Sequence, residues 1–252
     1  MIRLEKLCHT YGDFKVLEDL SFDLPRESIT CLLGPSGCGK TTLLHLMAGT
    51  LLLQGGRITG FPPGGISYLF QEPRLLPWKT LKKNMDLVLK NSFAREERER
   101  IIGETLSLVE LAAFGSYYPH QLSGGMRQRG ALARAFAFPA ELLLMDEPFQ
   151  ALDPALKLGL MEDFRRLWER DRRTTLLVTH NIQEATLLGD HILVLSRPPT
   201  RLITALENPV DPGDRQPFGE GVLALERQLY LTLMEGRREE DQPCIFPWSS
   251  RE

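Results

Sequence analysis

A glycine-rich string at residues 34–41 has the composition of a phosphate-binding loop. It follows an apolar run, Ile29–Leu33, and precedes apolar residues at helical spacing, Leu44 and Met47. The glycines let successive backbone N–H groups converge on one anion, and a helix N-terminus adds partial positive charge there. In this GxxxxGK[ST] pattern the lysine reaches the β- and γ-phosphates, and the hydroxyl binds Mg²⁺. The string predicts a nucleotide site made by Gly34, Pro35, Ser36, Gly37, Cys38, Gly39, Lys40, Thr41 and Thr42.

Two adjacent acids follow a second apolar run, Leu142–Met145. We expect Asp146, at the strand tip, to hold Mg²⁺ through water and Glu147 to act as a general base. Adjacent strand residues face opposite ways, but the chain turns where a strand ends, so both carboxylates can approach one site. A capping pair on a loop is the alternative interpretation of such acids, and the phosphate loop favours the catalytic one.

Residues 122–129, Leu-Ser-Gly-Gly-Met-Arg-Gln-Arg, form a second candidate anion site. Ser123 is expected to cap a helix whose apolar residues recur from Leu132 to Phe136, while Gly124 and Gly125 leave backbone N–H groups exposed. This site has no lysine. One chain therefore offers two phosphate-binding surfaces that lie well apart in the sequence.

The elements that would position these residues alternate between short apolar runs and helical patterns, which predicts an α/β fold with a mostly parallel sheet. Continuous apolar runs are typical of strands covered on both faces. The first 25 residues differ, because two runs flank a Tyr-Gly-Asp turn and predict an antiparallel hairpin. The hairpin strands are Arg3–Leu7 and Leu17–Leu24, and the core strands are Ile29–Leu33, Leu142–Met145, Thr174–Thr179 and Ile192–Leu195.

Helices are expected between these strands, including a helical insertion, because residues 73–122 contain no convincing core strand. A charged run, Arg95–Arg100, is interpreted as a solvated helix start with a Glu96–Arg100 pair at i,i+4. Near the end, residues 208–218 are rich in Pro, Gly and Asp, and a short amphipathic helix at Leu223–Leu233 precedes a frayed charged terminus. The expected helical stripes are Ile102, Leu106 and Val109, and Leu156, Leu160, Phe164 and Leu167 after Pro154.

The length of 252 residues and the 42% hydrophobic content fit one large α/β domain with an inserted subdomain and exclude disorder of the whole chain. A net charge of −3 argues against a nucleic-acid partner. No apolar run is long enough for a bilayer, and early charges argue against a signal peptide.

The cysteines Cys8, Cys31, Cys38 and Cys244 lack CxxC spacing, which argues against a zinc site or disulfides and favours a reducing, cytoplasmic setting. Cys38 is interpreted as a small loop filler whose surroundings could lower its thiol pKa.

Taken together and in order, these motifs resemble the ATP-binding-cassette ATPases over about residues 1–205. The resemblance implies a P-loop NTPase with a RecA-like, mostly parallel core sheet and an N-terminal antiparallel β subdomain. It also implies an inserted helical subdomain at about 73–128 and a short C-terminal helical tail, 206–252. ATP and Mg²⁺ are the implied cofactors.

The same resemblance implies roles for single residues. Tyr11 would stack on adenine, Gln71 would touch Mg²⁺ or the attacking water, and His180 would act as a switch near the γ-phosphate. For Tyr11 the alternative is a turn aromatic that packs locally, and for His180 a structural histidine. The implied catalytic set is Lys40, Gln71, Glu147 and His180, and the implied metal set is Thr41, Gln71 and Asp146.

The resemblance further implies that two copies pair head to tail, each ATP lying between the phosphate loop of one copy and the signature of the other. The signature contacts are Ser123, Gly124, Gly125, Met126 and Gln128. Residues Ala151–Asp153 match the loop that links the two active sites, with Asp153 as its acidic member, although Gln150 stands where a serine is commoner. Hydrolysis would release the closed dimer.

The turn at residues 71–78, Gln-Glu-Pro-Arg-Leu-Leu-Pro-Trp, could present an apolar surface to a partner. The alternative is that Leu75, Leu76 and Trp78 pack inside the insertion. This string, with residues 195–199 and 223–227, resembles the nitrate/sulfonate/taurine group of import ATPases. That resemblance implies separate permease subunits, indirectly a solute-binding protein, and a peripheral position on the cytoplasmic face of the inner membrane.

Two other function classes remain open from the sequence. One is a cassette ATPase that works in assembly or repair, against which the 71–78 turn and the lack of a coiled-coil arm argue. The other is a different P-loop enzyme, such as a kinase or GTPase, against which the signature at 122–129 argues.

Overall fold

The structure is a computed structural model that describes residues 1–150 and 152–240. Ala151 of the expected linking loop, Cys244 and the expected frayed end therefore lie outside the described residues. The elements in chain order are β1 (Ile2–Tyr11), β2 (Phe14–Leu24), β3 (Ile29–Leu33), α1 (Lys40–Met47), β4 (Gly55–Thr59), β5 (Ile66–Leu69), α2 (Leu81–Leu89), α3 (Arg95–Leu108), α4 (Gly124–Ala137), β6 (Leu142–Asp146), α5 (Pro154–Arg170), β7 (Thr174–Thr179), α6 (Ile182–Leu188), β8 (His191–Leu195), β9 (Leu202–Glu207) and α7 (Glu220–Glu240).

The core is a six-stranded sheet in the order β5-β6-β7-β3-β8-β9, parallel except for β9, which runs antiparallel to β8. The predicted parallel sheet is confirmed, with β3 and β7 as predicted and β6 longer by Asp146. Strands β4 and β9 were not predicted, because half-exposed edge strands lack a continuous apolar run. The predicted domain boundary at 205 falls inside β9, whose Leu206 and Glu207 still pair with β8.

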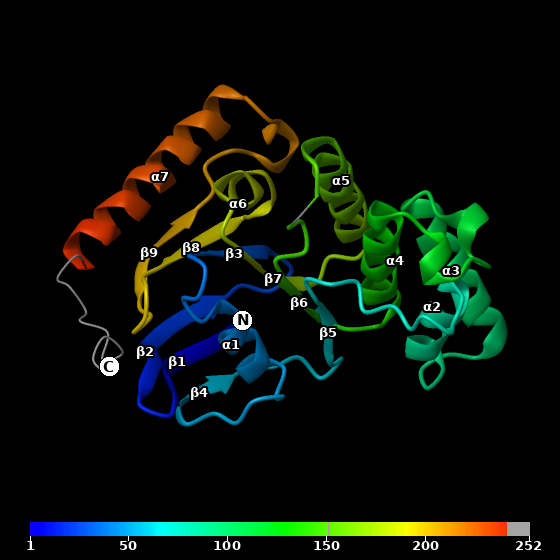
Figure 1. Cartoon of the computed structure of the whole chain (residues 1–252), viewed down its shortest axis with the longest axis horizontal. Coiled ribbons are helices and arrows are strands. Elements are labelled where there is room, and N and C mark those ends of the chain that lie inside the picture. Colours follow the sequence, from blue (N-terminus) through cyan, green and yellow to red (C-terminus); the bar gives the residue numbers. More distant parts are fainter. Residues whose placement is uncertain (151, 241–252) are drawn as a thin grey trace, which may run out of the picture.

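Helix α1 lies between the core sheet and the separate three-stranded sheet β2-β1-β4 (Figure 1). The alternation of side chains along β6 shows why the strand is apolar throughout. Leu142 and Leu144 belong to the core cluster with α1, β1 and β2, whereas Leu143 and Met145 belong to the cluster with α4, α5 and α6. The carboxyl ends of the parallel strands therefore meet at one edge, between two packed layers, and this is where ligands bind in such sheets. The predicted N-terminal hairpin is confirmed as β1 and β2.

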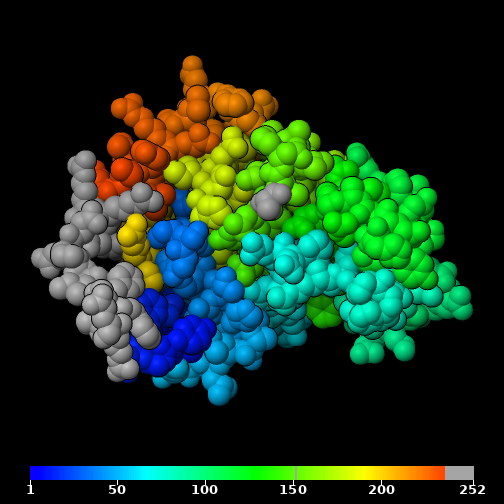
Figure 2. Space-filling model, in the orientation of Figure 1, coloured from blue at the N-terminus to red at the C-terminus, as the bar shows by residue number. Residues whose placement is uncertain are grey.

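Helices α2, α3 and α4 project from the sheet as the expected helical insertion, in cyan and green at the right of Figures 1 and 2. Helix α4 continues to Ala137 and packs on the core, so the expected limit at residue 128 falls inside a helix. The expected Glu96–Arg100 pair is wrong. Arg100 binds Glu97 and Glu104 instead, each at 2.6 Å. Residues three and four positions away on a helix are both within reach of an exposed arginine, so the i,i+4 spacing alone does not select Glu96 over Glu97.

The C-terminal tail is packed onto the core by a helix longer than the sequence predicts. Helix α7 extends from Glu220 to Glu240 and buries Val222, Leu225 and Leu229 against the core. Before it, the buried Arg215 donates to Asp190 Oδ1 at 3.0 Å. Within the part of the chain that the structure describes, no helix combines the length and apolar character needed to cross a membrane.

Candidate active site

The phosphate loop joins β3 to α1, and its shape depends on two left-handed glycines. Gly37 has φ +79° and Gly39 has φ +90°, a region that glycine enters without steric cost. A Cβ atom on Gly39 would stand 2.5 Å from Val16 Cγ1, so close packing against β2 also requires the missing side chain. Ser36 and Gly37 are exposed, and they form an open rim to the loop.

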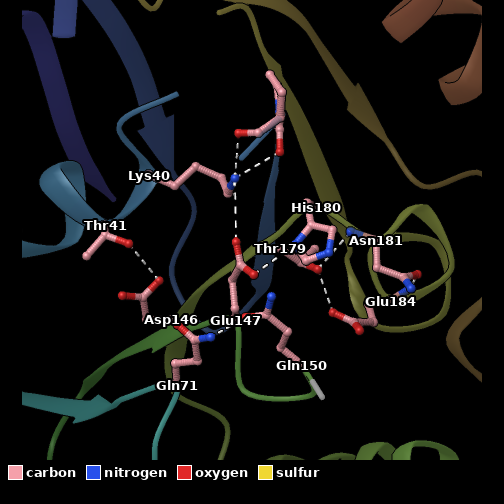
Figure 3. Close-up of polar contacts among 12 residues, drawn as sticks. Lys40, Thr41, Gln71, Asp146, Glu147, Gln150, Thr179, His180, Asn181 and Glu184 are labelled. Carbon is pink, nitrogen blue, oxygen red and sulfur yellow. Dashed lines mark hydrogen bonds and ion pairs between the residues drawn. The ribbon is translucent and has the colours of Figure 1, made fainter. Parts of the chain in front are cut away.

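Lys40 fills the centre of this loop. Its side chain is only 4% exposed, and Nζ donates to the carbonyl oxygens of Gly34 and Pro35 at 2.8 and 2.9 Å (Figure 3). Nζ also lies 3.6 Å from Glu147 Oε1. A buried ammonium group surrounded by acceptors in this way is placed to exchange one of them for a phosphate oxygen.

Asp146 faces the loop from the end of β6. Its Oδ1 accepts from the Thr41 hydroxyl at 3.1 Å, and its Oδ2 accepts from the Tyr68 hydroxyl at 3.4 Å. Burial raises the pKa of the Asp146 carboxyl, opposed by the Thr41 hydrogen bond. Burial and the nearby Asp146 charge likewise raise the pKa of Tyr68, which keeps it a phenol. Sequence reasoning missed Tyr68, whose signal is its place on β5, the strand beside β6.

The residues present fit a Mg²⁺ ion. Thr41 and Asp146 converge two hard oxygen donors beside the phosphate loop, and Mg²⁺ is commonly held by one or two protein groups together with waters and phosphates. No group of three or more His, Cys, Asp or Glu gathers among the described residues to form an all-protein metal cage. Gln71, the third predicted metal residue, instead donates its side-chain amide to Gln150 Oε1.

Glu147 turns away from Asp146 because its backbone lies in the left-handed region, with φ +44°. A non-glycine residue in this region costs about 1–3 kcal/mol and commonly marks a functional site. The turn brings Oε2 within 2.8 Å of His180 Nδ1 and Oε1 toward Lys40 (Figure 3). The two acids thus reach the same sheet edge in different directions, as expected from the end of the strand.

His180 follows β7 directly and is 40% exposed in its side chain. The residue before it, Thr179, accepts from Gly34 N at 3.4 Å and donates its hydroxyl to Glu184 Oε2 at 2.5 Å. Lys157 donates to the other oxygen of Glu184 at 2.8 Å. Sequence reasoning missed this Lys157–Glu184 pair, since a lysine and a glutamate on separate helices carry no motif.

The residues of the second predicted anion site lie at the N-terminus of α4. Ser123 caps the helix as expected, accepting from Met126 N at 3.3 Å, and both Ser123 and Gly124 are exposed. Gln128 is 5% exposed, and its amide donates to the backbone oxygens of Gln71 and Pro148. Gln128 therefore joins α4 to the loops after β5 and β6.

Two further expected residues take distinct places. Tyr11 ends β1 with a 52% exposed ring that meets His9 edge-on at 4.8 Å. Asp153 caps α5, accepting from Leu156 N at 3.1 Å.

Cys38 is fully buried, as expected of a loop filler, but the expected lowering of its thiol pKa is wrong. Burial raises the pKa of Cys38, and the nearby Lys40 opposes this shift only in part.

The turn at 71–78 supports both interpretations in part, packing inside the insertion and an apolar surface for a partner. Leu75 is 8% exposed and belongs to the core cluster that the insertion shares with the main sheet, whereas Trp78 is 71% exposed. One residue of the turn is therefore packed, and the other offers a large apolar surface to solvent. Tryptophan is enriched at protein interfaces, because its ring offers a large apolar surface together with a polar N–H group.

Comparison with known proteins gives consistent matches. The family model described as ABC transporter matches residues 17–150. The chain is 38% identical over 206 residues to an aliphatic sulfonates import ATP-binding protein of Bacillus cereus, covering 78% of this chain and 80% of that protein. It is 41% identical over 198 residues to a taurine import ATP-binding protein of Rhizobium johnstonii, covering 76% of each.

Solved structures agree with these matches. A dimeric bacterial ABC transporter cassette superposes with a TM-score of 0.72 at 27% identity, covering 84% of this chain and all of that one. A dimeric post-hydrolysis state of that cassette, bound to ADP and Pi, superposes with a TM-score of 0.71 at 26% identity over the same 84%.

Proposed function

The chain belongs to the ABC transporter family of ATP-binding cassettes and is an import-type ATPase. From this premise we propose that it powers the uptake of sulfonate-type solutes such as taurine. The observation that carries the enzymatic part is the convergence of Lys40, Glu147 and His180 at the mouth of the phosphate loop. The solute class rests on the sulfonate and taurine import relatives.

The residues at and beside the phosphate loop have different roles in this proposal. Backbone N–H groups of the loop and Lys40 bind the phosphates, and Tyr11 offers its exposed ring to the adenine base. Thr41 and Asp146 would hold Mg²⁺, which supplies charge compensation to the phosphate oxygens. Gln71 lies at the same edge of the sheet, next to Gln150.

Glu147 acts as the general base for the attacking water. Its carboxylate lies between two groups that orient it, Lys40 at 3.6 Å and His180 at 2.8 Å. Once the phosphates engage Lys40, His180 remains to hold the carboxylate toward the water. The catalysis is mainly positioning and charge stabilisation, as in phosphoryl transfer generally.

Two copies are needed for a complete site in this proposal. The signature residues Ser123 and Gly124 are exposed at a helix N-terminus, a place that binds anions, but they bring no cation. They would close over an ATP held on the phosphate loop of a second copy, in a head-to-tail dimer with two such sites. The dimeric solved cassette is a precedent for the pairing.

Separate permease subunits are the membrane partners, and a solute-binding protein delivers the solute to them. The exposed Trp78, on the insertion and near the Gln71 loop, is the surface we assign to the permease contact. The chain itself would lie on the inner face of the membrane as a peripheral subunit. Mechanical coupling would then pass through the turn at 71–78.

Uptake by intact cells tests this function. A strain of the source organism that lacks the chain should lose uptake of labelled taurine or alkanesulfonates, and the parental chain should restore it. Glu147→Gln should be expressed at the parental level without restoring uptake. Full uptake of taurine and alkanesulfonates without the chain would contradict the proposal.

The remaining candidate, a cassette ATPase acting in assembly or repair, predicts a different partner. Purification of the tagged full chain from detergent-solubilised membranes should recover an integral membrane permease with the parental chain and less with Trp78→Ala. Recovery of ATPase activity with no membrane protein would favour the assembly or repair role.

A further inference from the structure

Glu184 is a buried carboxylate that has no part in the chemistry described so far. It is 3% exposed on α6, and both of its oxygens are engaged, one by the Thr179 hydroxyl and the other by Lys157. Withdrawing an ion pair from water costs desolvation energy that the pair repays only in part, so such a pair is weak evidence of a role in stability. Its geometry instead indicates a role in positioning.

One end of the pair reaches the switch histidine. The Thr179 hydroxyl that binds Glu184 also accepts from Asn181 N at 3.0 Å, so the residues on both sides of His180 are fixed by one hydroxyl. The Thr179 carbonyl accepts from Gly34 N of the phosphate loop. A shift of Glu184 would therefore move His180 relative to Glu147 and to the bound phosphates.

The other end of the pair reaches the signature. Lys157 lies in the first turn of α5, the helix that Asp153 caps. Its neighbour Leu156 places its two methyl carbons 3.4 and 3.6 Å from the position that a Cβ on Gly125 would take. The start of α5 thus contacts the signature through Leu156, so a tilt of the signature helix would act on the turn of α5 that holds Lys157.

From this juxtaposition we infer that the Lys157–Glu184 ion pair is a positioning device that couples the signature of a chain to the His180 of the same chain. The inference rests on the proposed function, in which the signature faces the ATP of the partner and His180 faces the chain's own ATP. The pair would then transmit the closure of one composite site to the other, and it would give the dimer cooperative hydrolysis.

The test measures steady-state ATP hydrolysis by the purified full chain across ATP concentrations. Lys157→Met should lower the Hill coefficient toward 1, because closure of one composite site no longer reaches the other. It should also lower kcat, because His180 is no longer held in place beside Glu147. ATP affinity, measured without hydrolysis on the monomer, should change by less than about twofold, because no atom of the pair lies at the nucleotide. Lys157→Arg keeps the charge and should restore cooperativity.

Glu169→Gln is the matched control, since it removes an exposed carboxylate that pairs with Arg165 on the same helix. It should keep the parental Hill coefficient and kcat. If Lys157→Met does not fold, the double variant Lys157→Met/Glu184→Gln avoids an unpaired buried charge and should show the same loss of cooperativity.

The outcomes separate the inference from the function on which it rests. A parental chain that hydrolyses ATP with a Hill coefficient of 1, or a Lys157→Met variant that behaves like Glu169→Gln, would overturn the coupling role and leave the ATPase intact. A parental chain with no ATP hydrolysis and no ATP-dependent dimer would overturn the proposed function itself.

Discussion

The two regions of this chain that we predict to bind phosphate differ in what they supply. The phosphate loop brings a buried cation, and the strand ends beside it bring two carboxylates and a histidine. The signature at the N-terminus of α4 brings the exposed cap Ser123 and the exposed backbone of Gly124. Its two arginines are engaged elsewhere, Arg127 with the Leu122 carbonyl and Arg129 with acids outside α4. The first region can bind and process a nucleotide phosphate, whereas the second can only complete a site whose charges lie elsewhere.

The difference follows from where each region lies in the fold. The phosphate loop stands at the carboxyl edge of the parallel sheet, where β3, β6 and β7 end next to one another. The signature lies on the helical insertion, which has no sheet edge of its own (Figure 1). A chain that carries one phosphate loop and one signature is therefore expected to work as a pair with a second copy.

Glu147→Gln should have the largest effect, because it removes the proton acceptor and keeps the shape of the side chain. Turnover should fall by about 10²–10⁴-fold, the usual contribution of general-base catalysis. ATP should stay bound and hold the dimer closed, which size-exclusion chromatography with ATP detects. A monomeric variant that hydrolyses ATP at the parental rate would refute the base assignment.

Lys40→Ala should weaken ATP binding by about tenfold to a hundredfold, in line with the loss of charge-assisted hydrogen bonds. The phosphates lose the cation at the centre of the loop. Equilibrium titration with a fluorescent ATP analogue measures this change, and circular dichroism confirms the fold. Unaltered titration would contradict the phosphate-loop assignment.

Mixing two inactive variants tests the head-to-tail pairing directly. Lys40→Ala removes the cation from one loop, and Gly124→Asp puts a negative charge at the signature, where it would repel a phosphate. Each variant alone has two defective sites, but a mixed dimer has one site with an intact loop and an intact signature. Hydrolysis should therefore reappear on mixing, and no recovery in verified mixed dimers would break the comparison.

The turn at 71–78 also combines two unlike residues, the packed Leu75 and the exposed Trp78. Leu75→Ala should destabilise the chain by about 2–5 kcal/mol, as buried leucines commonly do. Trp78→Ala should leave thermal stability and ATPase activity of the free chain near parental values and should reduce the coupling to transport. Thermal melts and uptake assays separate the two variants.

Much of this contrast could be read from the sequence, for a physical reason. Strands β3, β6 and β7 are covered on both faces, so they appear as apolar runs, and the loops that follow them carry motif residues such as Lys40 and Glu147. The edge strand β9 was not predicted, because every second residue is exposed and the apolar run is interrupted. The partners of Arg100 were also not predicted, because an exposed guanidinium has several carboxylate partners of similar energy.

Contacts between distant elements were the hardest part of the site to predict. Tyr68 on β5 donates to Asp146 on the adjacent strand β6. Lys157 on α5 binds Glu184 on α6. Neither pair has a fixed sequence spacing, since the tertiary packing alone brings them together. The burial of Gln128 likewise depends on loops that lie 57 and 20 residues away.

The smallest expected effect concerns Cys38, which reports how closed the phosphate loop is. Burial raises the pKa of its thiol, so at a given pH less of it is the reactive thiolate, and alkylation should be slow near neutral pH. The rate should rise about tenfold per pH unit up to the raised pKa, as long as the loop stays folded. Mass spectrometry of the alkylated protein should find Cys8, which is partly exposed on β1, labelled before Cys38. Equal labelling of both at pH 7 would contradict the burial of Cys38 and, with it, the packed phosphate loop that distinguishes this region from the signature.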